Sequence, residues 1–141
     1  MINSYLNKFI SKFYKQSVPS TQIRLFSVID VVVSSLRIDR LLATGLGTGR
    51  NKIELSLLSG CVKLNGKTVI DKSVEVKKGD IIDRISQENS TEEKYVLARV
   101  QLQEIGEKTN KGNIKVRLMR SKYIVIEKLN YQSSIQIESR E

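Results

Sequence analysis

The chain has 141 residues, enough for one compact domain with short extensions and too few for a second large catalytic domain. Its 24 Lys and Arg residues against 15 Asp and Glu give a net charge of +9, which favours phosphate-bearing partners such as nucleic acid or a membrane surface. The sequence has no histidine and one cysteine, which excludes a His-based triad, an internal disulfide and a zinc cluster. We therefore expect no catalytic residue, no metal and no cofactor. No apolar run approaches the ~18 residues of a membrane span.

The first 26 residues have the composition of a mitochondrial transit peptide. They hold four cations and no acidic residue, and apolar residues recur among them at helical spacing. The segment Arg24-Leu25-Phe26-Ser27 resembles a matrix-processing site, so we expect the mature chain to begin near Ser27 and to reside in the mitochondrial matrix. An amphipathic surface helix or a basic arm that binds RNA is the alternative interpretation of residues 1–26. Residues 27–35 are interpreted as a short linker.

Two short helices are predicted after this segment. The serine pair at 34–35 is the candidate cap of the first helix, and Thr48 is the candidate cap of the second, which runs to Leu58. Three glycines within 45–49 are expected to break the first helix, and Gly60 is expected to stop the second. The spacing of three or four residues predicts these core positions: Ile38, Leu41, Leu42, Leu46, Ile53 and Leu57.

From Gly60 onward the apolar residues alternate, which predicts strands. Asn65-Gly66 is the strongest short hairpin signal in the sequence. Strands are expected at 62–64, up to 69, and at 74–76, 81–85, 96–102, 114–118 and 123–126, with polar turns or loops at 77–80, 86–94 and 106–113. The expected fold is α+β. It has two helices packed on a small twisted, antiparallel-rich sheet within residues 36–85, a C-terminal β extension over 86–129 and a frayed tail over 130–141.

Residues 36–85 resemble the S4 RNA-binding domain. The resemblance starts with the run Arg37-Ile38-Asp39-Arg40-Leu41-Leu42 and continues with Gly49-Arg50 at the start of the second helix. It then follows the family's glycine, hairpin and Gly-Asp turn, at Gly60, Val62, Leu64, Asn65, Gly66, Val69, Val76, Gly79, Asp80 and Ile82. Gly49 in place of the family's serine and Ser56 in place of a large apolar residue are departures, and neither shifts the register. The resemblance implies an S4-like fold that binds structured RNA.

The residues expected to contact RNA are mainly cations of the two predicted helices and the hairpin: Arg37, Arg40, Arg50, Asn51, Lys52, Lys63 and Lys67. Cations beside the free backbone N–H groups of a helix start bind phosphates favourably, and such a shallow surface reads backbone and shape. A solvated charged face is the alternative interpretation. A second RNA contact surface is expected from cations near the C-terminus: Lys115, Arg117, Arg120 and Lys122. Asp39 is expected to orient a neighbouring arginine.

Other residues with chemical potential are interpreted as structural. Position 50 is an arginine and no Gly-Lys-Ser/Thr follows the glycines, so a phosphate loop is not expected. Cys61 has no histidine to activate it and is interpreted as a strand residue. Asn65 and Gly66 are expected to form a turn, and Asp80 is expected to cap a turn. Three tyrosines could stack on bases, although in strands such residues more often belong to a core or an edge: Tyr95, Tyr123 and Tyr131.

The chain resembles the mitochondrial transcription rescue factors in the transit segment, in the run Leu36 to Lys52 with its Thr-Gly-Leu and Gly-Arg-Asn-Lys, and in the basic tail. In plan it is also similar to stand-alone bacterial S4 proteins that bind obstructed large ribosomal subunits carrying peptidyl-tRNA. The resemblance implies a non-catalytic protein that binds rRNA and tRNA on the large mitoribosomal subunit and supports rescue of stalled ribosomes and mitochondrial transcription under stress. The Gly-Gly-Gln tripeptide of release factors is absent, so a release-factor-like partner would perform peptidyl-tRNA hydrolysis. The alternatives are a structural or assembly protein of the mitochondrial ribosome, a membrane-surface protein and an enzyme of reduced size.

Overall fold

The computed structural model describes residues 26–139 of the chain, and within this range six strands form one sheet. The strand order is β1-β6-β5-β4-β2-β3, and every neighbouring pair is antiparallel. The strands are β1 (Ser27–Val33), β2 (Val62–Leu64), β3 (Lys67–Thr68), β4 (Ile81–Ile85), β5 (Lys94–Lys108) and β6 (Ile114–Glu127). The helices are α2 (Ile38–Leu46), α3 (Arg50–Leu58) and α4 (Lys128–Ser139). The predicted α+β class with an antiparallel sheet is confirmed, and the S4-like assignment remains a prediction.

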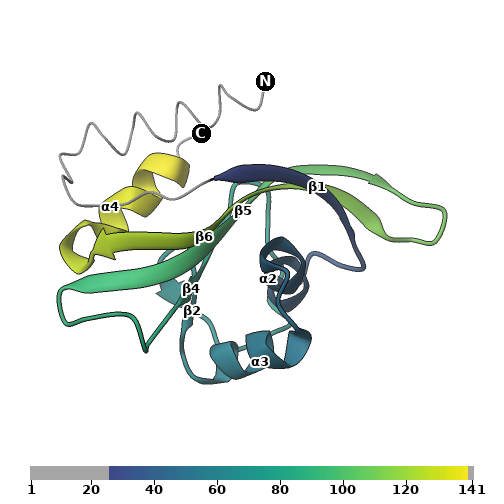
Figure 1. Ribbon diagram of the computed structural model, residues 1–141. Helices are drawn as coiled ribbons and strands as arrows, with labels where there is room; N and C mark the ends of the chain where they lie inside the picture. The colour runs from purple at the N-terminus through teal and green to yellow at the C-terminus, as the bar shows by residue number, and fades with distance from the viewer. Residues whose placement is uncertain (1–25, 140–141) are drawn as a thin grey trace.

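Helices α2 and α3 lie against one face of the sheet (Figure 1). All six apolar residues that were predicted from helical spacing are buried there, together with residues of the facing strands such as Val62, Ile82, Val100 and Leu118. Gly45 belongs to α2 and does not break it, because the helix continues to Leu46 and ends at Gly47, which adopts φ 62°. A Cβ atom at Gly45 would lie 2.9 Å from a methyl carbon of Val100. The glycine therefore lets α2 approach β5 closely.

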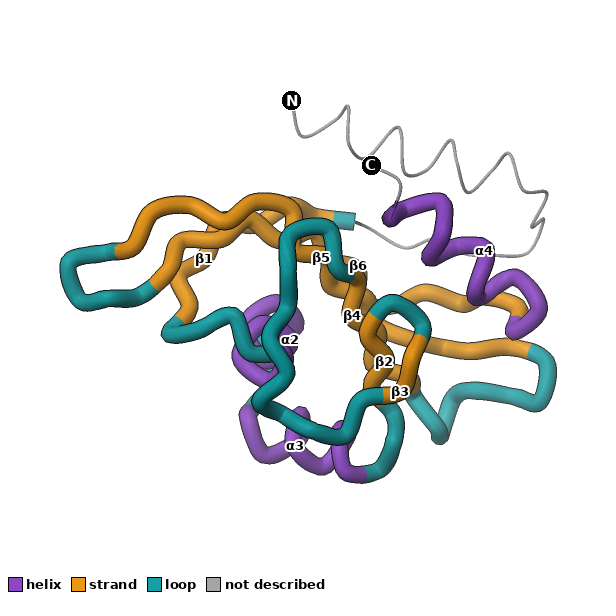
Figure 2. Tube along the Cα trace, turned by 180° about the vertical axis from the view of Figure 1, so that it is seen from behind, coloured by secondary structure: helices purple, strands orange, loops and turns teal. Residues whose placement is uncertain are grey.

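Helix α4 covers part of the opposite face of the sheet (Figure 2). A second apolar core lies between them, formed by Phe26, Ile81, Ile85, Leu97, Met119, Ile124, Ile126, Tyr131 and Ile135. A buried polar network crosses this core. The Arg99 guanidinium donates from Nε and Nη2 to the Asp83 carboxylate at 2.6 and 2.9 Å, and the Tyr131 hydroxyl donates to Asp83 Oδ2 at 2.6 Å. These bonds tie α4 to β4 and β5 from within.

The hairpin between β2 and β3 has the turn that its sequence predicts. Asn65 has φ 51° and Gly66 has φ 84°, the two positive values that a type I′ turn requires. The Asn65 side chain donates to Asp80 Oδ1 at 3.0 Å and accepts from the backbone N–H of Ile81 at 2.9 Å. Asp80 also accepts from the backbone N–H of Lys77 at 2.8 Å, so its predicted capping role is confirmed. The hairpin tip is thereby fixed to the start of β4.

Two predictions at the ends of the domain are wrong. Residues 27–35 are not a linker, because Ser27–Val33 form β1 and pair with β6 along the sheet edge. Residues from 130 do not fray within the described range, because α4 runs to Ser139 and its residues Tyr131, Ser134 and Ile135 are buried. In both segments tertiary burial overrides a weak local signal. The transit-peptide prediction falls on residues 1–25, which lie outside the described part, and on Phe26, which is 5% exposed in the second core.

Several helix and strand boundaries in the structure also differ from those predicted. The N-caps of α2 and α3 are Arg37 and Gly49, without side-chain caps, in place of the serine pair at 34–35 and Thr48. Residues 74–76 form no strand and pair only locally with the chain before α2, where Glu75 makes an isolated bridge to Arg37. Residues 123–126 belong to β6, and β5 and β6 extend into the polar segment at 106–113, which leaves a turn of 109–113. The polar residues at these ends do not predict strand structure. The backbone hydrogen bonds between β5 and β6 extend the two strands there nonetheless.

Candidate functional site

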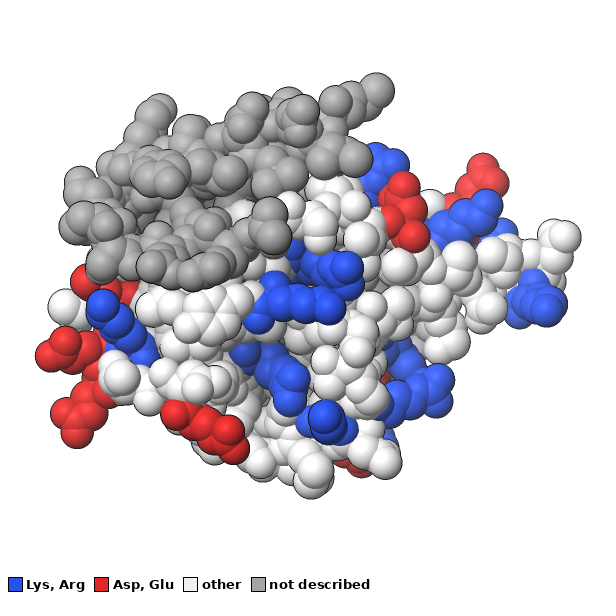
Figure 3. Space-filling view, in the orientation of Figure 1, with Lys and Arg blue, Asp and Glu red and all other residues white. Residues whose placement is uncertain are grey.

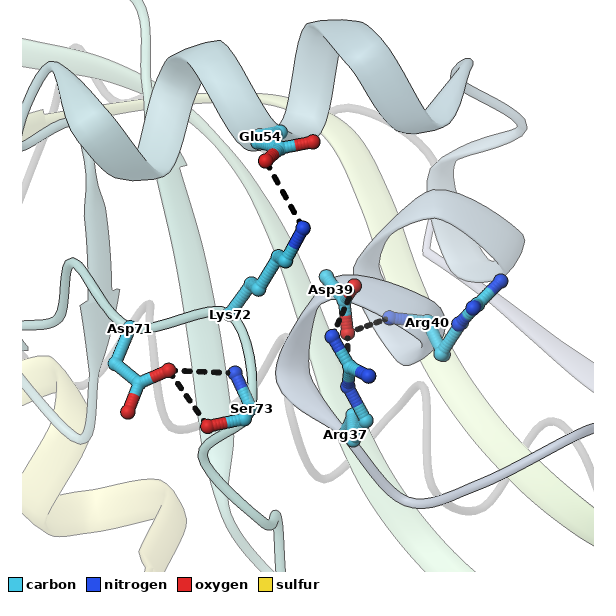
Figure 4. Close-up of polar contacts among 7 residues, drawn as sticks. All are labelled: Arg37, Asp39, Arg40, Glu54, Asp71, Lys72 and Ser73. Carbon is cyan, nitrogen blue, oxygen red and sulfur yellow. Dashed lines mark hydrogen bonds and ion pairs between the residues drawn. The ribbon is translucent and has the colours of Figure 1, made fainter.

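The first candidate residue, Arg37, is held in place by its neighbour Asp39. Arg37 lies just before α2, and its Nε and Nη2 each donate to the Asp39 carboxylate at 3.1 Å (Figure 4). Asp39 Oδ1 also accepts from the backbone N–H of Arg40 at 3.0 Å. The expectation that Asp39 orients an arginine is thus confirmed for Arg37. The charge of Arg37 is largely compensated by this contact.

Arg40 and Arg50 converge from α2 and α3 on one small hollow. It measures about 200 Å³, is also lined by Val32, Val33 and Asn113, and is called the α2–α3 corner below. In Figure 4 the Arg40 side chain points away from Asp39. Arg50 and Asn51 occupy the first turn of α3, whose N-cap Gly49 has no side chain to accept the free backbone N–H groups. The corner therefore combines two cations with the positive end of a helix.

The third cation of this face, Lys52, lines a larger hollow of about 490 Å³, called the α3–β6 hollow below. Arg84 from β4, Lys122 from β6 and the loop at 86–89 also line it. Arg84 Nε donates to Ser56 Oγ at 2.9 Å, and Ser56 Oγ donates to the backbone carbonyl of Lys52 at 2.9 Å. Ser56, which departs from the S4 pattern, therefore connects α3 to a cation of the sheet.

Helices α2 and α3 each carry one acidic residue, and both of these residues form ion pairs. Asp39 binds Arg37, and Glu54 of α3 accepts from Lys72 Nζ at 3.0 Å (Figure 4). Among the described side chains, those of residues 26–136, no ion pair engages the cations that line the two hollows: Arg40, Arg50, Lys52, Arg84 and Lys122. Figure 3 shows Lys and Arg side chains gathered in the middle of this view of the molecule, with most carboxylates toward its margins. This face carries uncompensated positive charge.

The structure does not bring the hairpin lysines to this site. Lys63 lies on the α4 side of the sheet, where its Nζ is 5.2 Å from the ring centre of Tyr95 and 5.3 Å from that of Tyr131. Lys67 is exposed on the edge strand β3 and lines neither hollow. Strand alternation turns Lys63 away from the helix face, whereas Lys67, which pairs with Leu64 of the helix-side core, is kept from both hollows by its place on the edge strand. The sequence alone does not say which face the helices cover.

The four cations expected to form a second surface lie on two faces. Arg117 Nε donates to Asp30 Oδ1 at 2.8 Å, and Lys115 lines the same side of the β1–β6 edge. The hydrogen bond from Arg117 holds the pKa of the exposed Asp30 carboxyl below its usual value. Arg120 lies on the helix side, donating to the Gly45 carbonyl at 2.9 Å and to Ser27 Oγ at 3.2 Å. Lys122 alone joins the primary site.

The three tyrosines also differ. Tyr131 is buried, and burial together with the nearby Asp83 raises the pKa of its hydroxyl. Tyr95 is half-buried, and its ring forms a T-shaped pair with that of Tyr131, with 5.2 Å between the ring centres. Tyr123 is 44% exposed and lines the α3–β6 hollow. Cys61 precedes β2 and contributes to the floor of the same hollow.

The sequence did not single out Arg84. The run Ile81-Ile82-Asp83-Arg84-Ile85 has no clean alternation, since both faces of β4 are covered by helices. Arg84 shares a face with Ile82 of the helix-side core, whereas Asp83 faces α4.

Among the residues that the structure describes, no group of three His, Cys, Asp or Glu side chains is placed to hold a metal ion. Within the same residues, no helix combines the length and the apolar character that crossing a membrane requires.

Comparison with known proteins identifies a family over most of the chain. The model of the mitochondrial transcription rescue factor 1 C-terminal domain matches residues 28–128, so α4 lies almost wholly outside the match. The mouse protein named mitochondrial transcription rescue factor 1 is 39% identical over 101 residues, which cover 71% of this chain and 42% of the mouse protein. The human protein of that name is 32% identical over 109 residues, 77% of this chain and 45% of the human protein. The chain thus spans less than half the length of these curated relatives.

Proposed function

The chain belongs to the family of the mitochondrial transcription rescue factor 1 C-terminal domain, and on this premise we propose that it is a non-catalytic mitochondrial protein that binds structured RNA. One observation supports RNA binding most directly. Both acids of α2 and α3 are engaged in ion pairs, whereas Arg40, Arg50 and Lys52 have no acidic partner among the side chains of residues 26–136. Desolvating an ion pair would oppose binding, but these cations need no such step to meet a phosphate.

The geometry favours recognition of backbone and shape over sequence. Arg40 and Arg50 meet at the α2–α3 corner beside the free N–H groups of α3, and Lys52 and Arg84 continue the cationic surface into the α3–β6 hollow. Phosphates bind well at helix starts flanked by cations. A-form RNA displays its phosphates and 2′-hydroxyls on a broad surface, while its deep major groove is closed to side chains. A folded RNA therefore suits this shallow site, and the S4-like assignment of residues 36–85 agrees with it.

The proposed role follows the names of the relatives and the resemblance of the sequence. The chain acts in the mitochondrial matrix, where it supports transcription under stress and binds rRNA and tRNA on the large mitoribosomal subunit. A release-factor-like protein performs peptidyl-tRNA hydrolysis on stalled ribosomes, because this chain lacks the Gly-Gly-Gln tripeptide.

Salt dependence of RNA binding tests the site. The full chain is compared with a variant in which Arg40, Arg50 and Lys52 are replaced by Ala, using a transfer RNA and fluorescence anisotropy between 50 and about 300 mM salt. The control replaces Lys77, Lys78 and Lys128 by Ala, which removes the same charge from positions that line neither hollow. Each lost phosphate contact is expected to lower the slope of log K against log salt by about 0.7–0.9.

The proposal holds if the site variant loses about two to three units of slope and the control loses less than one. Equal losses in both variants would show that net charge alone attracts RNA. Binding to anionic vesicles as strong as to RNA would favour a membrane-surface protein. Sedimentation of mitochondrial extracts separates the remaining roles, because a structural mitoribosomal protein would be stoichiometric with every large subunit, whereas a rescue factor would be enriched on stalled ones.

A further inference from the structure

The α3–β6 hollow contains an aromatic ring as well as cations. Tyr123 and Lys122 both line it, although they are adjacent residues of β6, and a regular strand would send them to opposite faces. The pairing of β5 and β6 explains this arrangement. Leu97 pairs with Ile124 and Arg99 pairs with Ser121, so the single residue Ala98 lies opposite both Lys122 and Tyr123. This β-bulge turns a cation and an exposed aromatic ring toward the same hollow.

Arg84 is prepared to bind an anion in this hollow. Its Nε is committed to Ser56 Oγ, which fixes the plane of the guanidinium. Among residues 26–136, whose side chains the structure describes, its two Nη groups have no hydrogen-bond acceptor, and the neighbouring Asp83 is on the other side of the sheet with Arg99. Lys52 and Lys122 line the hollow from either side, and Glu88 on the loop is the acid that lines it. A phosphate placed at Arg84 would thus meet up to three cations.

The loop that closes the hollow offers amide groups. Gln87 and Asn89 both line it. Asn89 Nδ2 donates to Ser86 Oγ at 3.0 Å, which leaves its amide oxygen as an acceptor, and no hydrogen bond within the described part of the chain engages the Gln87 side chain. The volume of about 490 Å³ lies in the range of sites that hold one small ligand.

We propose that the α3–β6 hollow binds one unpaired nucleotide of an RNA strand, with its base stacked on Tyr123 and its phosphate held by Arg84, Lys52 and Lys122. Gln87 and Asn89 face the edge of the base. This inference rests on the proposed RNA binding and deepens it, because it adds an unpaired nucleotide to the backbone contacts of the α2–α3 corner. Stacking on a tyrosine tolerates every base, since each base has an aromatic face. The site therefore selects unpaired over paired nucleotides without selecting a sequence.

Two RNAs and three variants of the full chain test the inference. The RNAs are a blunt hairpin and the same hairpin with a short single-stranded extension, and a nucleoside monophosphate serves as the free-nucleotide probe. Tyr123→Ala removes the ring, and Tyr123→Phe retains stacking without the hydroxyl. The chain has no tryptophan, so Tyr123→Trp introduces a single fluorescent reporter that a stacked base quenches. Leu129→Trp, at an exposed position of α4, is the matched reporter control.

Tyr123→Ala is expected to weaken binding of the extended hairpin by about 5- to 150-fold and binding of the blunt hairpin by less than about twofold. Tyr123→Phe keeps the wild-type affinity, and the extended hairpin quenches the reporter at 123 but not the one at 129. The inference is overturned, while the proposed function stands, if RNA binds well but Tyr123→Ala affects both hairpins alike and no quenching occurs. Binding of the monophosphate as tightly as the extended hairpin would overturn it in favour of a free-nucleotide site. If neither hairpin binds, both proposals fail.

Discussion

Replacing Asp83 by Asn is expected to destabilise the fold by about 3–5 kcal/mol, the usual effect of removing one partner from a buried ion pair. The Asp83 and Arg99 side chains are 1% and 3% exposed, and their closest contact is 2.6 Å. Asparagine has nearly the same shape as aspartate, so packing barely changes. The variant instead removes the negative charge of Asp83 from beside the buried Arg99 guanidinium and weakens the hydrogen bond from Tyr131. The predicted loss therefore reports electrostatics and not a cavity.

Urea unfolding at pH 7, followed by circular dichroism, measures this loss. In thermal unfolding, each kcal/mol of lost stability lowers the melting temperature of a chain near this size by about 2–4 °C. The melting temperature should therefore fall by roughly 6–20 °C. Asp30→Asn is the control, because Asp30 makes the same kind of contact with Arg117 at 2.8 Å on the surface, where little change is expected. Replacing both Asp83 by Leu and Arg99 by Met should be less harmful than either single change. The reasoning is refuted if Asp83→Asn shifts the unfolding midpoint no more than Asp30→Asn does.

Three further predictions concern the α4 side of the sheet. Burial and Asp83 raise the pKa of Tyr131 above its ordinary value of 10.0, so the folded state keeps a proton that the unfolded state loses. The free energy of unfolding should therefore fall by up to about 1.4 kcal/mol per pH unit above pH 10 in the wild-type chain relative to Tyr131→Phe, and an identical pH dependence of the two would contradict this cause. Gly66→Ala should cost about 2–3 kcal/mol in urea unfolding, the sum of about 1–2 for backbone strain at φ 84° and about 1 for crowding, because a Cβ atom there would lie 3.0 Å from Ile135 Cδ1 and 2.7 Å from Gln132 Oε1 of α4. Gly112→Ala, with a similar φ of 83° but nothing within 4 Å, should cost only the backbone strain of about 1–2 kcal/mol, and equal costs would mean that α4 does not pack on the hairpin. Phe26→Ala should cost about 3–5 kcal/mol, and N-terminal sequencing of the mature protein should find Phe26 retained, in contrast to the cut before Ser27 that the sequence suggested.

The family match covers the proposed RNA-binding face of the sheet and leaves out almost all of α4 on the opposite face. The matched residues 28–128 include the α2–α3 corner and every residue that lines the α3–β6 hollow. Helix α4 lies beyond the match, yet it closes the second core and completes the Asp83 network. The proposed RNA contacts thus belong to the part of the chain shared with the family. The α4 contacts instead stabilise the opposite face of the same sheet.

Local signals identified the helices and the hairpin because their causes are local. Apolar spacing placed Ile38, Leu41 and Ile53 in the core, and Asn65-Gly66 produced the predicted turn. The strand at 27–33 was missed because an edge strand depends on its partner β6, which lies more than 80 residues away in the sequence. Its apolar run ends in Val31-Val32-Val33, and that signal could have identified it.

The sequence by itself determined the charge, the two helices with their buried apolar positions, the turn chemistry and the cations of α2 and α3. Only the tertiary structure decided which cations share a face. Lys63 is directed to the α4 side by strand alternation, Arg84 reaches α3 because β4 lies in the middle of the sheet, and a β-bulge turns Tyr123 toward the hollow that Lys52 also lines. The physical reason is that side-chain direction in a strand follows from register and pairing, which depend on residues distant in the sequence.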